Sequence, residues 1–370
     1  MEEKNEKDDG ETICTDDLIK RLELMKRQLD DAMNEKIDDS NSTSINSQMK
    51  NSSLNQYYSI KNLSYNPLSN NVPIFQKEIQ SLPNKMIPKN IILASFNDKQ
   101  QTMLLQRYLM SASAEEIDFI IKELRGIYRD IMKDKNGNYF CTDLFKTCDQ
   151  KHRIMILEEL SKYLSEDCLD NYATHPIQTL IEKASSEIEY KYILDSFYDD
   201  NKLLNASLDH NGPYVFEKIF KSIPNRYRTD LNLKIISFIL FISKTRFGIV
   251  TVKKFISLSM TSTVVSKLME LIRNNFMCLA EGKYSNYLIQ HLLEKWNNTS
   301  EGNEIKELIF NNFKTMCQNK YASFICELYI KILTPEEKNK LIQSLNHNLI
   351  IIANNPYAIK ILKVLGIYSY

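Results

Sequence analysis

The chain has 370 residues, 43% of them hydrophobic, and its 47 basic side chains balance 47 acidic ones, so the overall charge does not point to a nucleic-acid partner. Seven cysteines, an odd number with no C-x-x-C pair, argue against a disulfide framework or a zinc cluster and suit a reducing compartment. Eight glycines without a glycine-rich phosphate loop disfavour nucleotide-binding α/β folds, and the most apolar window, Ile235–Ile242, is far shorter than the ~20 residues that cross a bilayer.

The first 88 residues are predicted to form a mostly disordered extension, because they are rich in Asn, Ser, Asp, Glu and Lys and have little to bury. Residues 1–85 carry 15 acidic and 11 basic side chains, which leaves 32 acidic and 36 basic ones in residues 86–370. Apolar residues recur every three or four positions between Leu18 and Met33. This spacing predicts an amphipathic helix at about 16–35, which could dock a partner, dimerise or have no role. The first residues are acidic and lysine-rich, so we expect no secretory signal.

From about residue 90 onward the chain is predicted to be helical and repetitive. One phrase recurs: a small residue, a polar residue, an aromatic, two apolar residues and then Gln or Glu, as in S-N-Y-L-I-Q from Ser285. Its eight copies begin at anchor positions 101, 137, 173, 212, 248, 285, 322 and 358, which are 36 to 39 residues apart and define repeats one to eight. Second amphipathic stretches follow most copies, at 153–163, 261–274, 302–316 and 335–345. Because such helices cannot bury their apolar faces alone, we expect the repeats to stack into a curved α-solenoid.

The phrase itself carries a resemblance to a known family. S-N-Y-L-I-Q-H-L-L at 285–293 resembles the RNA-reading helix of PUF (Pumilio) repeats, and A-S-F-I-C-E at 322–327 is similar to the penultimate repeat of that family. HEAT and armadillo repeats would also give a curved rod, but with a longer period of ~40–47 residues. The resemblance covers residues 89–370 and implies an all-α fold, a right-handed curved α-solenoid of eight repeats. It also implies binding to single-stranded RNA, one base per repeat, through two side chains that contact the base edge and one that stacks.

Two repeats fit this pattern closely. On a helix, the polar residue after the anchor and the Gln or Glu four positions later share a face and could bracket one base edge, while the aromatic between them stacks. The resemblance implies that repeat six selects uracil through Asn286 and Gln290, with Tyr287 as the stacking residue. It implies that repeat seven selects guanine through Ser323 and Glu327, with Phe324 stacking, because a carboxylate accepts from both N–H groups of the guanine edge.

The other repeats depart from the pattern. Their base-edge candidates are Thr102, Gln106, Asn138, Thr142, Thr174, Gln178 and Glu217, and their stacking candidates are Met103, Tyr139, His175 and Tyr214. Pro213 offers no donor or acceptor in repeat four, so little selectivity is expected there. Repeats five and eight carry lysines instead, for which phosphate contacts are expected: Lys253, Lys360 and Lys363. The alternative for repeat five is a purely structural role. The last unit is expected to act as a cap. With the RNA antiparallel to the protein, as the resemblance implies, the target is 5′-(U or any)-G-U-n-n-A-(U)-A-3′.

Catalytic chemistry is not legible in the sequence. The five histidines lack metal-ligand spacing and no nucleophile stands near a base, so we expect neither an enzyme, nor a metal, nor a cofactor, nor a membrane partner. The resemblance implies a cytoplasmic monomer that binds elements in the 3′ untranslated regions of mRNA. Decay or repression proteins would then be recruited through the N-terminal extension or the convex face. The alternatives are a nucleolar PUF-like protein that acts in ribosome assembly and a helical scaffold that binds only proteins.

Overall fold

A computed structural model of the chain describes residues 86–346 and 349–367, all of which belong to one compact unit. The helix expected at 16–35, and nearly all of the expected extension, lie outside the described residues. Within these ranges the regular elements are α-helices and one short 3₁₀ helix, η3 (Asn225–Tyr227). The first of them, α4 (Lys89–Ser95), begins where the sequence becomes helical.

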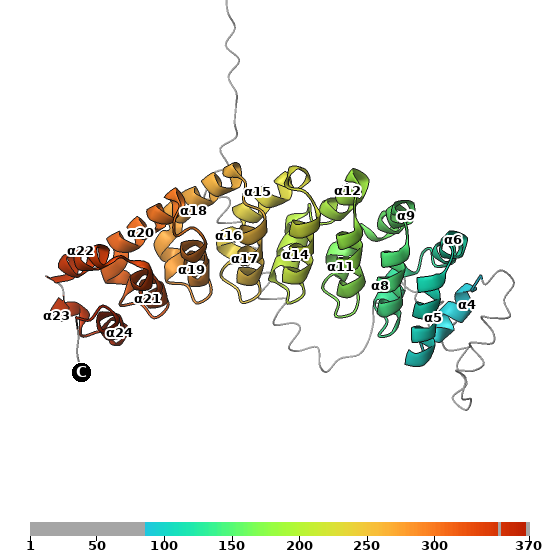
Figure 1. The fold of residues 1–370 in the computed structure, drawn as a ribbon, viewed down its shortest axis with the longest axis horizontal. Coiled ribbons are helices and arrows are strands. Elements are labelled where there is room, and N and C mark those ends of the chain that lie inside the picture. The colour runs from blue at the N-terminus through green and yellow to red at the C-terminus, as the bar shows by residue number, and fades with distance from the viewer. Residues whose placement is uncertain (1–85, 347–348, 368–370) are drawn as a thin grey trace, which may run out of the picture. The chain divides into compact units, whose positions relative to one another are not determined.

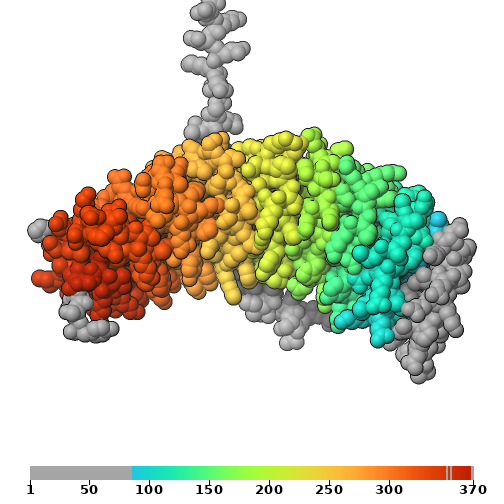
Figure 2. Space-filling model, viewed as in Figure 1, coloured from blue at the N-terminus to red at the C-terminus, as the bar shows by residue number. Residues whose placement is uncertain are grey.

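Two layers of helices build the described part of the chain, and they follow one another along an arch (Figure 1). The helices of the inner layer carry the eight anchors or begin directly after them: α5 (Lys99–Ser111), α8 (Gly137–Thr147), α11 (Thr174–Lys183), α14 (Gly212–Ser222), α17 (Gly248–Leu258), α19 (Asn286–Lys295), α21 (Ala322–Ile332) and α24 (Pro356–Val364). Each inner helix packs against the next inner helix along the chain. The repeats therefore stack without a gap, as the space-filling view also shows (Figure 2), and the expected α-solenoid is confirmed.

The outer layer lies on the convex side of the arch (Figure 1). It consists of α6 (Ala114–Glu123), α9 (Gln150–Leu160), α12 (Glu187–Asp195), α15 (Thr229–Ser237), α18 (Ser262–Ala280), α20 (Ser300–Met316) and α22 (Pro335–Leu345). Short helices precede several inner helices: α7 (Tyr128–Met132), α10 (Leu164–Asp167), α13 (Asp200–Leu208), α16 (Ile239–Ile242) and α23 (Leu349–Ile352). None of the described helices combines the length and hydrophobicity that crossing a bilayer requires.

The two layers begin their helices in different ways. All outer helices except α15 start at Ser, Thr or Asp caps, and three of these starts are complete capping boxes, as in Thr334 and Glu337 at α22. Most inner helices are instead preceded by an Asp or Asn three positions before the anchor, whose side chain accepts from the backbone. Asp134 Oδ1 accepts from the backbone N of Gly137, and Asn319 Oδ1 accepts from Ala322 N. Where this polar residue occurs, it fixes the chain direction at which the inner helix begins.

Close backbone contacts explain the small residue at the anchor. A Cβ atom at Gly212 would lie 1.6 Å from the carbonyl oxygen of Ala206 in α13, and one at Gly248 would lie 2.0 Å from that of Ile242 in α16. Real side-chain carbons do not approach an oxygen this closely, so glycine allows the inner helix to pack directly on the short helix before it.

Buried polar bonds tie neighbouring repeats together as well. Glu189 on α12 is fully buried and Arg153 on α9 nearly so, and Arg153 Nε donates to Glu189 Oε1 at 2.7 Å. The second carboxylate oxygen of Glu189 accepts from the backbone N of Ser185 and of Ser186, each at 2.9 Å. Burial raises the pKa of Glu189, but these hydrogen bonds and Arg153 outweigh it and hold the pKa below its ordinary value. The charged pair is thus fully bonded inside the outer layer.

Candidate nucleic-acid interface

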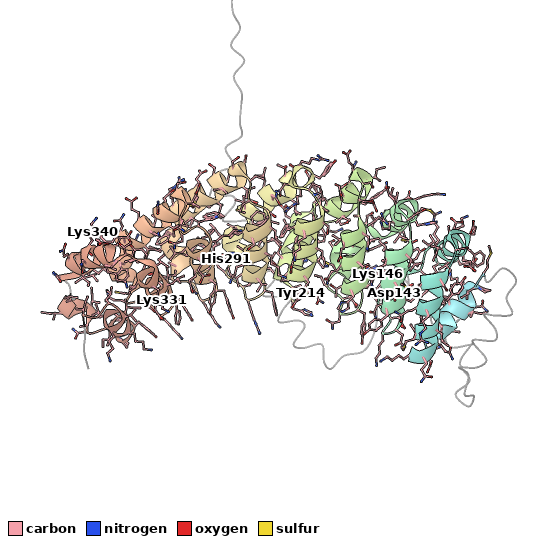
Figure 3. All side chains as sticks on the ribbon, viewed as in Figure 1. Asp143, Lys146, Tyr214, His291, Lys331 and Lys340 are labelled. Atoms are coloured by element: carbon pink, nitrogen blue, oxygen red, sulfur yellow. The ribbon has the colours of Figure 1, made fainter. Side chains whose placement is uncertain are left out.

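One exposed side chain per repeat forms a row along the inner helices. It stands at the third position counted from the anchor, and the residues on either side of it are buried in repeats two to seven. In six repeats it is a large hydrophobic side chain, exposed by 40–58%, and in repeats three and eight it is a histidine and a lysine: Met103, Tyr139, His175, Tyr214, Val250, Tyr287, Phe324 and Lys360. Figure 3 shows Tyr214 on the inner side of the arch, with Lys340 of α22 on the outer side. Apolar surface repeated in one register marks a binding surface.

The second position, assigned above to the base edge, is buried. Thr102, Asn138, Thr174, Asn286 and Ser323 are exposed by 7% or less. Asn286 Nδ2 donates to the carbonyl oxygens of Gly282 and Lys283, at 2.8 and 3.0 Å. Asn138 Nδ2 makes the same two bonds to Asp134 and Lys135, at 3.0 and 2.8 Å. These asparagines therefore close the loop that precedes the inner helix, and they keep the side-chain oxygen as their remaining polar group.

The sixth position is half-buried and meets the second position in two repeats. Gln290 Nε2 donates to Asn286 Oδ1 at 2.6 Å, and Gln178 Nε2 donates to Thr174 Oγ1 at 3.1 Å. The structure thus brings together the expected base-edge pairs of repeats six and three. In repeat seven the two residues have separate partners: Ser323 Oγ donates to Lys320 O at 3.1 Å, and Glu327 accepts from Lys331 at 2.7 Å.

The expected pairs of repeats one and two are not joined. Thr102 Oγ1 turns to the carbonyl oxygens of Ser95 and Asp98, each at 3.0 Å. Gln106 Nε2 donates across to Asp143 Oδ2 of the next inner helix at 2.5 Å. In repeat two, Thr142 Oγ1 donates to the backbone oxygen of Asn138 at 2.8 Å, so its hydroxyl is engaged within its own helix.

Repeat four has a charged cluster around its exposed aromatic ring. Glu217 accepts hydrogen bonds from Lys221, on the same helix, and from Lys254 on α17. The bonds from Lys221 and then from Lys254 lower the pKa of Glu217 to about 2, so the carboxylate is charged at neutral pH. Lys254 Nζ also lies 4.7 Å from the centroid of the Tyr214 ring, within the range of a cation–π contact.

Repeats five and eight place lysines where the other repeats carry amides or carboxylates. Lys253 and Lys363 stand half-buried at the sixth position, and Lys360 is exposed at the third. His291 of repeat six lies near repeat five, with its Nε2 3.1 Å from Ser257 Oγ. Burial, and then the positive charges of Lys253 and Lys295, lower the pKa of His291.

The sequence analysis missed a set of charged residues on the inner helices. Lys146 pairs with Asp143 at 3.0 Å, and Lys218 of α14 pairs with Glu182 of α11. Figure 3 shows Asp143, Lys146 and Lys331 on the same inner side as Tyr214. The signal that could have found them is their fixed place at the seventh and tenth positions of the inner helices. Among the described His, Cys, Asp and Glu residues no cluster suited to a metal ion occurs.

No family model matches the chain, but individual proteins are similar to it in sequence. Its sequence is similar to Pumilio homolog 11 of Arabidopsis thaliana, with 26% identity over 204 residues, and to a Pumilio domain-containing protein of Schizosaccharomyces pombe, with 23% identity over 214 residues. These matches cover 54% and 58% of this chain, and 36% and 31% of the relatives' lengths.

Solved structures of Puf RNA-binding domains have a similar fold. The RNA-binding domain of yeast Puf5p bound to AAT2 RNA is similar with a TM-score of 0.66 and 19% identity, over 78% of this chain and 85% of that one. The Puf4 RNA-binding domain, bound to the 3′ UTR recognition sequence of the HO endonuclease RNA, is similar with a TM-score of 0.67 and 19% identity, over 74% and 85%. At such identities the likeness concerns the arrangement of the helices.

Proposed function

We propose that this chain, a divergent member of the PUF (Pumilio) family, binds single-stranded RNA along the inner side of its solenoid and selects it by sequence. The observation that carries the proposal is the row of exposed third-position side chains, one per repeat. A strand of RNA presents one base per nucleotide, so a row with one platform per repeat matches it in periodicity. Each base stacked on an aromatic platform contributes about 1–3 kcal/mol regardless of which base it is.

Selectivity is proposed to come from the polar side chains beside the platforms. After donating to Asn286, Gln290 keeps a second N–H and its carbonyl oxygen. The uracil edge offers one N–H between two carbonyl oxygens, which these groups can complement. In repeat seven, the Glu327 carboxylate can accept from the two neighbouring N–H groups of guanine. A mismatched base would leave such half-buried groups unpaired, at a cost of about 1–3 kcal/mol.

We infer from these assignments that the target contains a G-U step, read by repeats seven and six, within an element of an mRNA 3′ untranslated region. The two solved structures named above are bound to RNA, one of them to a 3′ UTR recognition sequence, and this supports the choice of target class. In this role the chain would act in the cytoplasm on translation or mRNA stability, together with repression or decay proteins.

A nucleolar role in ribosome assembly is the second candidate, and one observation favours it. The second position of repeats four, five and eight is occupied by Pro213, Ile249 and Ile359, none of which can contact a base edge by hydrogen bonds. A protein that reads few bases suits a target defined by structure more than by sequence. The paired amides of repeat six and the carboxylate of repeat seven favour the mRNA role.

Two measurements on the full chain test the proposal. Selection from a pool of random single-stranded RNA is expected to enrich a G-U step, and a selection without G-U enrichment contradicts the assignment of repeats six and seven. RNA crosslinked to the chain in cells is expected to be messenger RNA with sites in 3′ untranslated regions. Recovery of precursor ribosomal RNA would instead favour the second candidate, and salt-insensitive or absent RNA binding would favour a protein scaffold.

A further inference from the structure

In repeats two and five, the residue at the seventh position counted from the anchor faces the sixth residue of the repeat before it. Two hydrogen bonds across the repeats establish this geometry: Asp143 accepts from Gln106, and Lys254 donates to Glu217, in both cases 37 residues apart. We use the term facing residue for this position, which is occupied, from repeat two to repeat eight, by Asp143, Thr179, Lys218, Lys254, His291, Leu328 and Val364.

We call the third- and sixth-position side chains of a repeat its base site. We propose that the facing residue decides whether the base site of the preceding repeat is accessible to RNA, and that Lys254 closes the base site of repeat four. This inference rests on the proposed RNA binding and adds a specificity-determining residue to it. Its basis is that one ammonium group contacts both parts of the site, the ring of Tyr214 at 4.7 Å from the centroid and the carboxylate of Glu217.

The geometry explains why this site is closed. The Lys254 side chain is only 21% exposed, so its ammonium is held between the ring and the carboxylate and does not extend into solvent. A base that stacks on Tyr214 has to displace the ammonium from the ring. A guanine edge that pairs with Glu217 has to displace a charged donor as well, and a charge-assisted bond is stronger than a bond to a neutral N–H.

Repeat seven is a matched example of an open site in the same chain. Glu327 stands in the place of Glu217 and pairs with Lys331 four residues later, as Glu217 does with Lys221. The aromatic residue is Phe324, with 53% exposure against 56% for Tyr214. The two repeats differ at the second position, with Pro213 in repeat four and Ser323 in repeat seven, and in the facing residue. The facing residue of repeat seven is Val364 in α24, which carries neither a charge nor a hydrogen-bonding group. In repeat six the facing residue is Leu328, which is apolar too.

The same rule accounts for the pairing in repeat one. Its facing residue, Asp143, accepts from Gln106, so the amide N–H that would approach a base is already bonded to a carboxylate. Repeat three keeps its Thr174–Gln178 pair, because its facing residue, Lys218, pairs with Glu182 and not with Gln178. We therefore expect the RNA to be read at repeats six and seven and, through this pair, at repeat three. Between these, repeat four is a closed site, occupied by a residue of the protein.

Reciprocal substitutions in the full chain test the inference. Lys254→Val gives repeat four the facing residue of repeat seven, and Val364→Lys, at a position 45% exposed, gives repeat seven that of repeat four. The readout is the affinity for RNAs that carry each of the four bases at the nucleotide facing the altered repeat. Lys254→Val is expected to create a guanine preference of about tenfold or more at repeat four. Val364→Lys is expected to reduce the guanine preference at repeat seven by a similar factor.

A control variant and an internal reference keep the outcomes distinct. Lys221→Met removes the other partner of Glu217 but leaves Lys254 in place, so it is expected to create no preference at repeat four. In the same titrations, uracil preference at repeat six reports on the proposed function. If that preference is present, the inference is overturned by Lys254→Val without a gain in guanine preference, or by Val364→Lys without a loss. If preference is absent at repeats six and seven while Lys254→Val still gains guanine preference, the facing-residue rule stands and the assignment of those repeats falls.

Discussion

Gln290 Nε2 donates a 2.6 Å hydrogen bond to Oδ1 of Asn286, one turn earlier on the same inner helix. Asn286 is held in turn by its two bonds to the loop carbonyls of Gly282 and Lys283. The pair is therefore oriented before any ligand arrives, and little side-chain entropy remains to be lost on binding. Repeat six is the place where the protein's own hydrogen bonds most fully prepare a base-edge site.

The exposed platforms are expected to contribute to RNA affinity without contributing to the fold. Tyr287→Ala and Phe324→Ala should each weaken binding by about 1–3 kcal/mol for every base tested, because stacking does not depend on base identity. Their unfolding midpoints should stay within about 0.5 kcal/mol of the parent, because the rings are half exposed. Tyr198→Ala is the control, since Tyr198 is exposed by 65% beside the outer helices α12 and α15. If Tyr198→Ala weakens RNA binding as much as Tyr287→Ala and Phe324→Ala do, the row of third-position side chains is not the binding surface.

Repeat two lacks one group of a complete base-edge pair, and a single substitution should supply it. Asn138 makes the loop bonds that Asn286 makes, and Tyr139 is exposed by 58%, but Thr142 bonds to its own helix. Thr142→Gln is expected to create a uracil preference of about 1–3 kcal/mol at the nucleotide facing repeat two. Thr142→Met has about the length of glutamine without the amide and should create none. A glutamine variant with unchanged base preference would argue against paired amides as the source of selectivity.

The positions of the helices were largely predictable from the sequence, but the contacts between repeats were not. The anchors located the inner helices because a 36-residue period and helical spacing are local features, and α22 has the bounds expected for it, Pro335–Leu345. Other outer bounds moved by a few residues: the stretch expected at 153–163 is α9, Gln150–Leu160, because Asp149 caps the helix earlier. The contact between Lys254 and Tyr214 was not predictable, because it joins residues one repeat apart whose register depends on how the helices stack.

Removing one partner of the buried charged pair should destabilise the solenoid strongly. Arg153→Met leaves the buried Glu189 carboxylate without its guanidinium partner and is expected to cost about 3–5 kcal/mol in urea unfolding. Arg153→Met combined with Glu189→Met should cost less than the single change, because no buried charge is then left unpaired. In the parent chain, the low pKa of Glu189 contributes stability above the ordinary glutamate value of 4.5, and this contribution is lost as the pH falls below that value. A single variant as stable as the parent would contradict this account.

The glycine at the anchor of repeat four should not tolerate a methyl group. Gly212→Ala would place a carbon 1.6 Å from the carbonyl oxygen of Ala206, so α13 and α14 have to separate. The expected cost is about 1–3 kcal/mol in unfolding free energy, as for other overpacked sites. Repeats three and seven carry Ala173 and Ala322 at the same position, so the loss would come from this one close approach. An unchanged unfolding midpoint would mean that the two helices move apart at little cost.

The central claim is that second- and sixth-position side chains select the base, and repeat six offers the most direct measurement. Asn286→Ser combined with Gln290→Glu gives this repeat the side chains of repeat seven. The measurement is the binding of the parent and the double variant to four RNAs that differ only at the nucleotide facing repeat six. The parent should prefer uracil and the double variant guanine, each by about 1–3 kcal/mol over the other bases. An equal loss of affinity for all four RNAs would contradict the claim.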